Sequence, residues 1–279
     1  VTPAGGTAPF TYTLTAPTQT NTTGNFTGLA AGAYNITVKD NAGCTATLST
    51  TLTQPTAVTG TTSSVPVNCF GNSTGTVSAS GSGGVAPYTY LWPALGNSTL
   101  STVGGVAAGT YSVTIRDANL CPITLAVTVT QPTSLTLTST VTAATCGNAN
   151  GSGTVTVAGG TAPYNYNWSN GGLTNVLTFA SAGTYSITVT DFNGCVLTRT
   201  VSITNIPGPT AITGNTTLAG CNLSNGSYSV TGVTGGTPAY TYSVDGVATA
   251  ALTSGLSAGT HTVTVKDANG CAFSTTFII

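Results

Sequence analysis

Cysteine is the residue type in this chain whose spacing points most directly to chemistry. Seven cysteines form two repeating sets. One set follows an Asp-containing turn (Cys44, Cys121, Cys195, Cys271), and the other ends a predicted strand (Cys69, Cys146, Cys221). Regularly spaced cysteines in small β-rich segments are typical of disulfides formed in an oxidising compartment. Zinc is disfavoured because no cysteines have metal-ligand spacing and the chain has one His.

Two pairings of these cysteines fit the sequence. The first stays within each repeated segment and joins Cys69 to Cys121, Cys146 to Cys195 and Cys221 to Cys271. The second links neighbouring segments through Cys69 with Cys195 and Cys146 with Cys271, and leaves Cys44, Cys121 and Cys221 for segments outside the chain. A disulfide requires Cα atoms about 4.4 to 6.8 Å apart, but the two cysteines of one segment are expected at opposite ends of it. We therefore favour the second pairing and keep the first as the alternative.

The acidic residues and the single His are the remaining candidates for chemistry. All five acids are Asp, and four share one turn position (Asp40, Asp117, Asp191, Asp267). Calcium requires about six to eight oxygen ligands, so one carboxylate in each turn is too few. We expect these side chains to accept backbone hydrogen bonds instead. His261 has no Ser and acid in register with it, so we predict no catalytic, cofactor or metal site and no enzyme.

Two motifs repeat in fixed phase along the chain. The string Gly5-Gly6-Thr7-Ala8-Pro9 returns at Gly83, Gly159 and, shortened, at Gly235, with starts 78, 76 and 76 residues apart. The Asp-to-Cys turn repeats in step with it. Fixed phase indicates tandem modules, which usually provide reach or multivalency and not one unique pocket.

The repeated segments are predicted to be β-sandwiches. Apolar and hydroxyl residues alternate at period two, as in half-buried antiparallel strands, and no helical spacing occurs. In the third segment we expect strands at 134–145, 154–158, 164–168, 175–179, 185–190 and 195–204, with a polar turn at 147–153. This strand number and turn spacing indicate an immunoglobulin-like or fibronectin-like sandwich.

Aromatic residues on one face of a strand are predicted to form the core. The alternative is a stacking platform for sugars, but the outward positions of these strands are mostly Thr, Ser and Asn. The predicted core residues are Tyr88, Tyr90, Trp92, Tyr164, Tyr166, Trp168, Tyr111 and Tyr185, and His261 replaces the equivalent of Tyr185 in the fourth segment.

Short proline-containing joints separate the segments. We expect module 1 (1–54, lacking its first strands), module 2 (55–131), module 3 (132–207) and module 4 (208–279). Proline restricts the preceding residue, so these joints are semi-rigid. Strands of about seven residues plus loops give about 40 Å for each module and predict a rod of about 150 Å.

Composition limits the classes of partner. Only 3% of residues are charged and the net charge is −1, which gives no electrostatic attraction to nucleic acid or an anionic membrane. No apolar run reaches the roughly 18 residues of a membrane span. The chain lacks Met and a signal peptide, so we expect an internal piece of a longer secreted protein.

The motifs together resemble a known family. Gly159 to Trp168, Ala182 to Asp191, Asn193 to Cys195 and the joint Gln131 to Thr133 resemble the SprB repeat of Bacteroidota cell-surface proteins. The resemblance implies a very large filamentous adhesin that is exported by type IX secretion and displayed extracellularly on the outer membrane. In gliding members of the family it moves along the cell surface, so that the cell travels over a substratum.

We therefore predict a structural stalk that projects an adhesive region from the cell. Its expected partners are neighbouring repeats, an extracellular surface or polysaccharide, and anchoring or motility machinery bound through other regions. The alternatives are modules that themselves bind glycan through Trp92 or Trp168, or a passive spacer in a large secreted enzyme.

Overall fold

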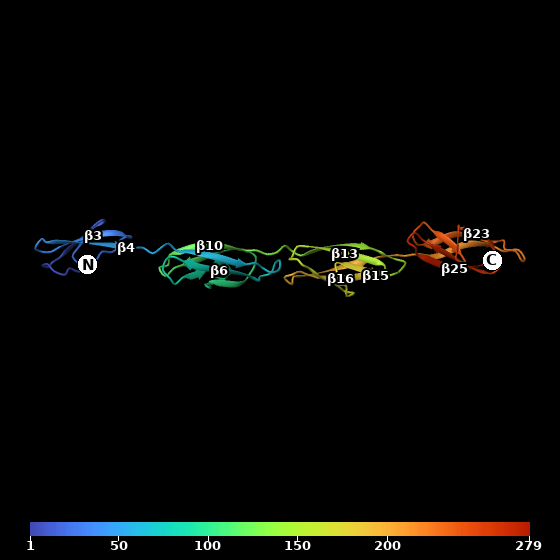
Figure 1. Cartoon of the computed structure of the whole chain (residues 1–279), viewed down its shortest axis with the longest axis horizontal. Coiled ribbons are helices and arrows are strands. Elements are labelled where there is room, and N and C mark those ends of the chain that lie inside the picture. Colours follow the sequence, from blue (N-terminus) through green and yellow to red (C-terminus); the bar gives the residue numbers. More distant parts are fainter. The chain divides into compact units, whose positions relative to one another are not determined.

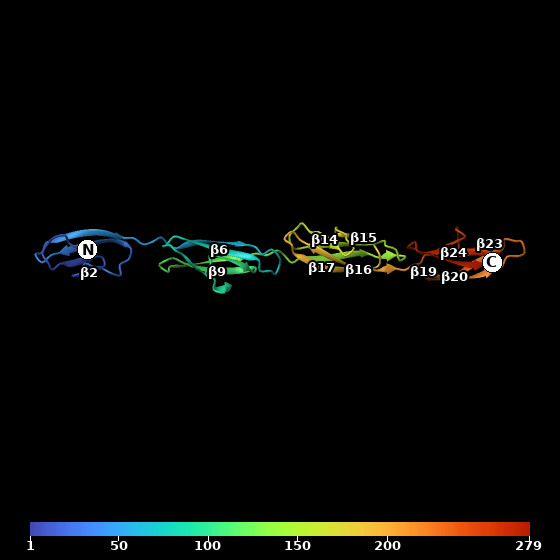
Figure 2. The same ribbon diagram turned by 90° about the horizontal axis from the view of Figure 1, so that it is seen from below.

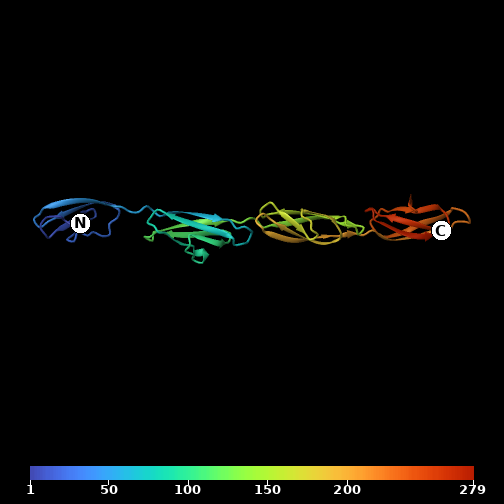
Figure 3. The same ribbon diagram turned by 60° about the horizontal axis from the view of Figure 1, so that its bottom comes forward.

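The computed structural model describes all residues, 1–279, and it is built from β-strands (Figure 1). Only η1 (Pro93–Leu95), a single 3₁₀ turn, is helical. The predicted all-β class is confirmed, and Figure 3 shows the same arrows and loops from another side. The structure contains no helix with the length and hydrophobicity of a membrane span.

Packing contacts divide the chain into two compact units, which are described separately. The first comprises Val1–Val65, Thr76–Gly104 and Gly109–Thr128, and the second comprises Pro66–Gly75, Gly105–Ala108 and Val129–Ile279. We keep the module numbers of the sequence repeats for orientation within these units.

In the first unit, module 1 forms one four-stranded antiparallel sheet. Its strands lie in the order β2 (Thr18–Asn21), β1 (Thr11–Thr15), β3 (Gly32–Lys39) and β4 (Thr45–Leu52). Leu14, Tyr34 and Ile36 are buried on one face, where alternate residues of β1 and β3 point inward.

Module 2 forms two three-stranded sheets. One contains β5 (Thr59–Val65), β6 (Gly75–Ser82) and β8 (Thr102–Val106), and the other contains β10 (Pro122–Val129), β9 (Gly109–Arg116) and β7 (Thr89–Leu91). Val77, Val113 and Ile115, at alternating positions of β6 and β9, are fully buried.

In the second unit, module 3 is a sandwich of two three-stranded sheets (Figure 2). One sheet contains β11 (Thr136–Thr142), β13 (Gly151–Ala158) and β15 (Val176–Ala180), and the other contains β14 (Asn165–Trp168), β16 (Gly183–Thr190) and β17 (Val196–Ile203). The core draws Val155 and Leu177 from the first sheet and Trp168, Ile187 and Val201 from the second. Apolar residues at every second position of both sheets therefore close one core.

Two strand boundaries of module 3 differ from the prediction. The first predicted strand is divided, because β12 (Ala144–Thr145) leaves the sheet and pairs in parallel with β18 (Asn205–Ile206). The predicted turn at 147–153 is also too long, since β13 begins at Gly151. A Cβ on Gly151 would lie 2.7 Å from Ile203 Cγ2, so this glycine allows a close approach of strands and does not mark a turn.

Module 4 has a three-stranded and a four-stranded sheet. The first contains β19 (Pro209–Thr217), β20 (Gly226–Gly235) and β23 (Leu252–Leu256), and the second contains β22 (Val247–Thr249), β21 (Thr241–Val244), β24 (Thr260–Lys266) and β25 (Ala272–Ile278). Its core includes Tyr228, Val244 and Val263.

Candidate functional site

Hydrogen bonds to the Asp191 side chain hold the turn from Asp191 to Cys195, which carries the cysteine. One carboxylate oxygen of Asp191 accepts from the backbone N–H of Thr161 at 2.8 Å, and the other accepts from Asn193 at 2.9 Å and Cys195 at 2.8 Å. Asp191 is thus the link between the Gly-Gly bend and the cysteine turn. This contact explains why the two sequence motifs recur in fixed phase.

The same carboxylate contacts recur in the other modules. Asp40, Asp117 and Asp267 each accept from the residue after the Gly-Gly bend and from the turn cysteine. The hydrogen bond from the bend is the main cause that lowers the pKa of these three carboxyl groups. These Asp side chains therefore act as backbone acceptors in the turn.

The turn cysteine of one module is bonded to the preceding module. Cys195 is joined to Cys69 with Cα atoms 5.6 Å apart, and Cys271 is joined to Cys146 with Cα atoms 5.1 Å apart. The intra-module alternative is wrong for this structure, because its pairs are not the bonded ones and Cys44, Cys121 and Cys221 are free and exposed. The physical reason is the strand direction: β11 carries the chain away from the end where Cys195 lies.

Hydrogen bonds that the sequence analysis missed surround each disulfide. Asn205 accepts through Oδ1 from Gly147 N–H at 3.0 Å, and Gln131 accepts through Oε1 from Gly71 N–H at 2.8 Å. Asn193 donates through Nδ2 to the carbonyl of Asn68 at 3.1 Å. An amide residue recurs at the start of each joint, and this recurrence was the sequence signal from which these hydrogen bonds could have been predicted.

Gly208 allows the close packing beside the second disulfide. A Cβ at this position would lie 2.5 Å from Cys271 Cβ, a separation that real side chains do not adopt. The Pro-Gly-Pro joint thus combines restricted backbone freedom with the one residue that fits against the bonded cysteine.

The aromatic positions divide into buried and half-buried groups. Trp92 and Trp168 are 0% and 2% exposed, and their indole N–H groups donate to the carbonyls of Leu100 and Thr174, each at 2.9 Å. The tyrosines are half-buried (Tyr88, Tyr90, Tyr111, Tyr164, Tyr166, Tyr185). The hydroxyl groups of Tyr88 and Tyr164 donate to the carbonyls of Gly83 and Gly159 in the bend. Neither Trp face is available for stacking on a sugar.

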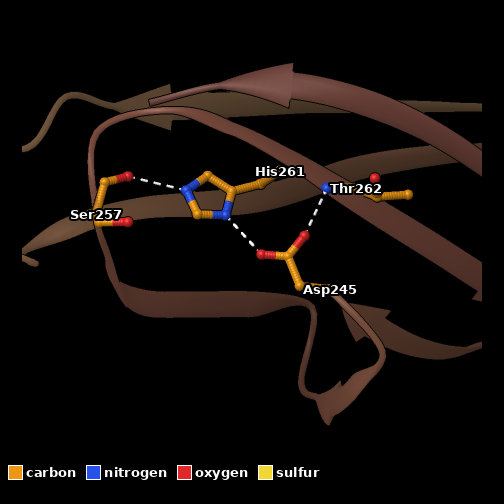
Figure 4. Close-up of polar contacts among 4 residues, drawn as sticks. All are labelled: Asp245, Ser257, His261 and Thr262. Atoms are coloured by element: carbon orange, nitrogen blue, oxygen red, sulfur yellow. Dashed lines mark hydrogen bonds and ion pairs between the residues drawn. The ribbon is translucent and has the colours of Figure 1, made fainter.

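A tyrosine corner in modules 1 and 3 becomes a His–Asp pair in module 4. Tyr34 and Tyr185 donate to the carbonyl four residues earlier, at 2.6 and 3.0 Å. His261 makes the equivalent contact from Nε2 to the carbonyl of Ser257 at 2.8 Å (Figure 4). Its Nδ1 lies 2.6 Å from Asp245 Oδ2, so both ring nitrogens face acceptors.

This arrangement requires a doubly protonated imidazole ring. A carbonyl and a carboxylate only accept, so each ring nitrogen must donate. The hydrogen bond that His261 donates to Asp245 is the main cause that raises the pKa of His261, and the same bond lowers the pKa of Asp245. Because Nε2 is bonded to a carbonyl and the ring is 9% exposed, the dyad has no free nitrogen to activate a nucleophile.

Two of the sequence repeats contain a segment that matches a protein-family model. Residues 61–97 and 138–173 match the family model of the SprB repeat. Each of these two segments is similar to the SprB repeat. The matched residues lie in modules 2 and 3, and the resemblance read from their motifs is confirmed there.

No curated protein sequence matches the chain. Similar solved structures include the Ca²⁺-stabilised adhesin with which an Antarctic bacterium binds ice (16% identity, TM-score 0.38, covering 96% of this chain and 88% of that one). They also include a tetra-tandem repeat from the extending region of a large adhesion protein (16% identity, TM-score 0.29, covering 99% and 93%). A third is the N-terminal eight Ig domains of Down Syndrome Cell Adhesion Molecule (11% identity, TM-score 0.25, covering 95% and 51%), of which this chain spans about half the length.

Proposed function

We propose that the chain is a structural stalk segment of a large secreted filamentous adhesin at the cell surface. The observation that carries this proposal is that both disulfides join neighbouring sequence repeats, and two of these repeats contain segments that match the SprB repeat model. A covalent staple across each of these joints restricts bending between repeats, which suits a part whose task is to hold another region at a distance.

Small-angle X-ray scattering of the oxidised chain tests the stalk. A rod of about 150 Å has a radius of gyration of about 43 Å, whereas a compact globule of this length has about 19 Å. We expect a value close to the rod. A radius of gyration near 19 Å would contradict the proposal, and a chain with all cysteines replaced by Ser serves as the control for the contribution of the disulfides.

The cellular role follows from the SprB repeat alone and is part of the same proposal. We infer four modules (1–54, 55–131, 132–207, 208–279), a Bacteroidota source, type IX export, outer-membrane attachment and a role in surface attachment and gliding. Deletion of the gene should abolish gliding on glass, and antibodies to this segment should label intact cells. Unchanged gliding with normal surface labelling would restrict the proposal to attachment.

A further inference from the structure

The two disulfides, taken with the backbone, create two covalent routes through module 3. The first enters from the backbone before β11 and leaves through Cys146 to Cys271. The second enters from Cys69 through Cys195 and leaves along the backbone after Ile203. Each joint of module 3 is therefore crossed by a peptide bond and by a disulfide.

Each route crosses module 3 along a strand that is already extended. β11 carries the first route and β17 carries the second. An extended strand rises about 3.3 Å for each residue, close to the maximum of about 3.6 Å, so pulling at its two ends produces almost no lengthening. Each strand also pairs along its length with a neighbour, β11 with β13 and β17 with β16.

The two routes are held together where they leave the module. Ala144 N–H donates to the carbonyl of Thr204 at 2.9 Å, and Cys146 N–H donates to the carbonyl of Ile206 at 3.0 Å. These bonds form the parallel β12–β18 bridge, in which both routes run in the same direction. Because tension pulls both strands in the same direction, it does not peel this bridge open.

Residues 147–194, which contain most of the buried core of module 3, lie outside both routes and form a longer third covalent path through the module, from Cys195 back to Cys146. In a module without these disulfides, the pull would pass through that core and draw it out. Here the load bypasses the core while the adjoining modules remain folded.

We propose that the interlocked disulfides make this chain a tension-bearing tether whose extension is covalently limited. This role rests on the stalk function proposed above, but it depends on covalent connectivity and not on an elongated shape or an adhesive target. The load is any pull between the two ends of the chain, such as that between a cell and the surface it holds.

Single-molecule force spectroscopy of the full chain, attached at both ends, measures the contour length that the disulfides prevent from extending. We call this the withheld length. Each disulfide alone closes 126 or 125 residues. At about 3.5 Å for each residue, this withholds about 440 Å. In the fully extended chain the shortest covalent path runs through Cys69–Cys195, back along the backbone to Cys146 and through Cys146–Cys271, so the two disulfides together withhold about 150 residues, or about 530 Å. We expect wild type to gain about 530 Å of final extension when the disulfides are reduced.

Single substitutions separate this connectivity from intra-module bonds. Cys195→Ser and Cys271→Ser should each lower the withheld length from about 530 to about 440 Å. Cys121→Ser is the matched control and should leave the withheld length unchanged. With intra-module bonds, the withheld length of this variant would instead fall by about 50 residues, or about 180 Å.

Equal final extension of oxidised and reduced wild type would overturn the tether, as would a shorter withheld length in Cys121→Ser. Either result, combined with a rod-like radius of gyration, would leave the stalk standing. A compact particle with the expected contour lengths would instead contradict the stalk alone.

Discussion

At the scale of single residues, His261 shows how one substitution changes a repeated tyrosine corner while its hydrogen bond to the backbone is kept. The imidazole keeps the bond to the carbonyl four residues earlier that Tyr34 and Tyr185 make. Asp245 occupies the place of Ser169, since both accept from the backbone N–H of the residue after the corner. The pair thus replaces a neutral corner with a charged one.

We predict that this corner weakens as pH rises. The pKa of His261 is raised above its ordinary value of 6.5, so its contribution to stability is complete below about pH 6.5 and is lost as pH rises through the folded-state pKa. The pKa of Asp245 is lowered, so the contribution of this carboxylate to stability is complete above its ordinary pKa of 3.8 and is lost only as pH falls below that value. Because the chain has a single His, one Cε1–H signal reports the titration by NMR, and its midpoint should lie above 6.5.

Reciprocal substitutions of His261 and Tyr185 give the controls for this prediction. His261→Tyr should remove the loss of thermal stability between pH 6 and 9, a range below the raised pKa of the neighbouring Tyr228. Tyr185→His faces Ser169 in place of Asp245 and should titrate with a lower midpoint than His261. A midpoint of 6.5 or less for His261 in the folded chain would show that the imidazolium is not stabilised.

At the scale of elements, module 3 shows how alternation in two sheets closes around one large side chain. Trp168 ends β14, is 2% exposed, and packs in the core with Ile187 and Val201 of its own sheet and Val155 of the facing sheet. The prediction of Trp168 as a core residue followed from its place in an alternating strand. The division of β11 from β12 was not visible in the pattern, because both halves alternate and only the pairing partner changes.

Trp168→Ala should destabilise module 3 by about 3 to 5 kcal/mol, because it removes the largest buried side chain and leaves a cavity. Native-state hydrogen exchange of the β16 amides measures this loss within the full chain. Leu173→Ala is the matched control: Leu173 is 73% exposed, so its truncation should change stability by less than about 0.5 kcal/mol. Equal protection in both variants would place Trp168 outside the cooperative core.

At the scale of the whole chain, the cysteines define which modules are covalently joined. The Asp191-type turn holds one cysteine of each bond, and the loop after β12 or β5 holds the other. The two structural bonds overlap in sequence, so neither module 2 nor module 4 can be separated from module 3 by a single backbone cleavage within residues 147–194.

Alkylation under non-reducing conditions should modify three cysteines, Cys44, Cys121 and Cys221, because these thiols are free and exposed. Reduction in denaturant should raise the number to all seven. Intact-mass spectrometry gives both counts, and peptide mapping identifies the linked pairs. One modified cysteine before reduction, at Cys44, would favour the intra-module pairing.

The sequence alone determined the module repeat, the all-strand class, the inward aromatic positions and the two sets of cysteines, because each depends on local periodicity or on turn chemistry. It limited the cysteine pairing to two schemes. Only the tertiary structure distinguishes them, because β11 and β17 decide which end of a module each cysteine occupies. The His261–Asp245 pair, the Asn205 contact to Gly147 and the β12–β18 bridge also required the structure. Each joins residues distant in sequence, and no local pattern encodes which strand ends meet.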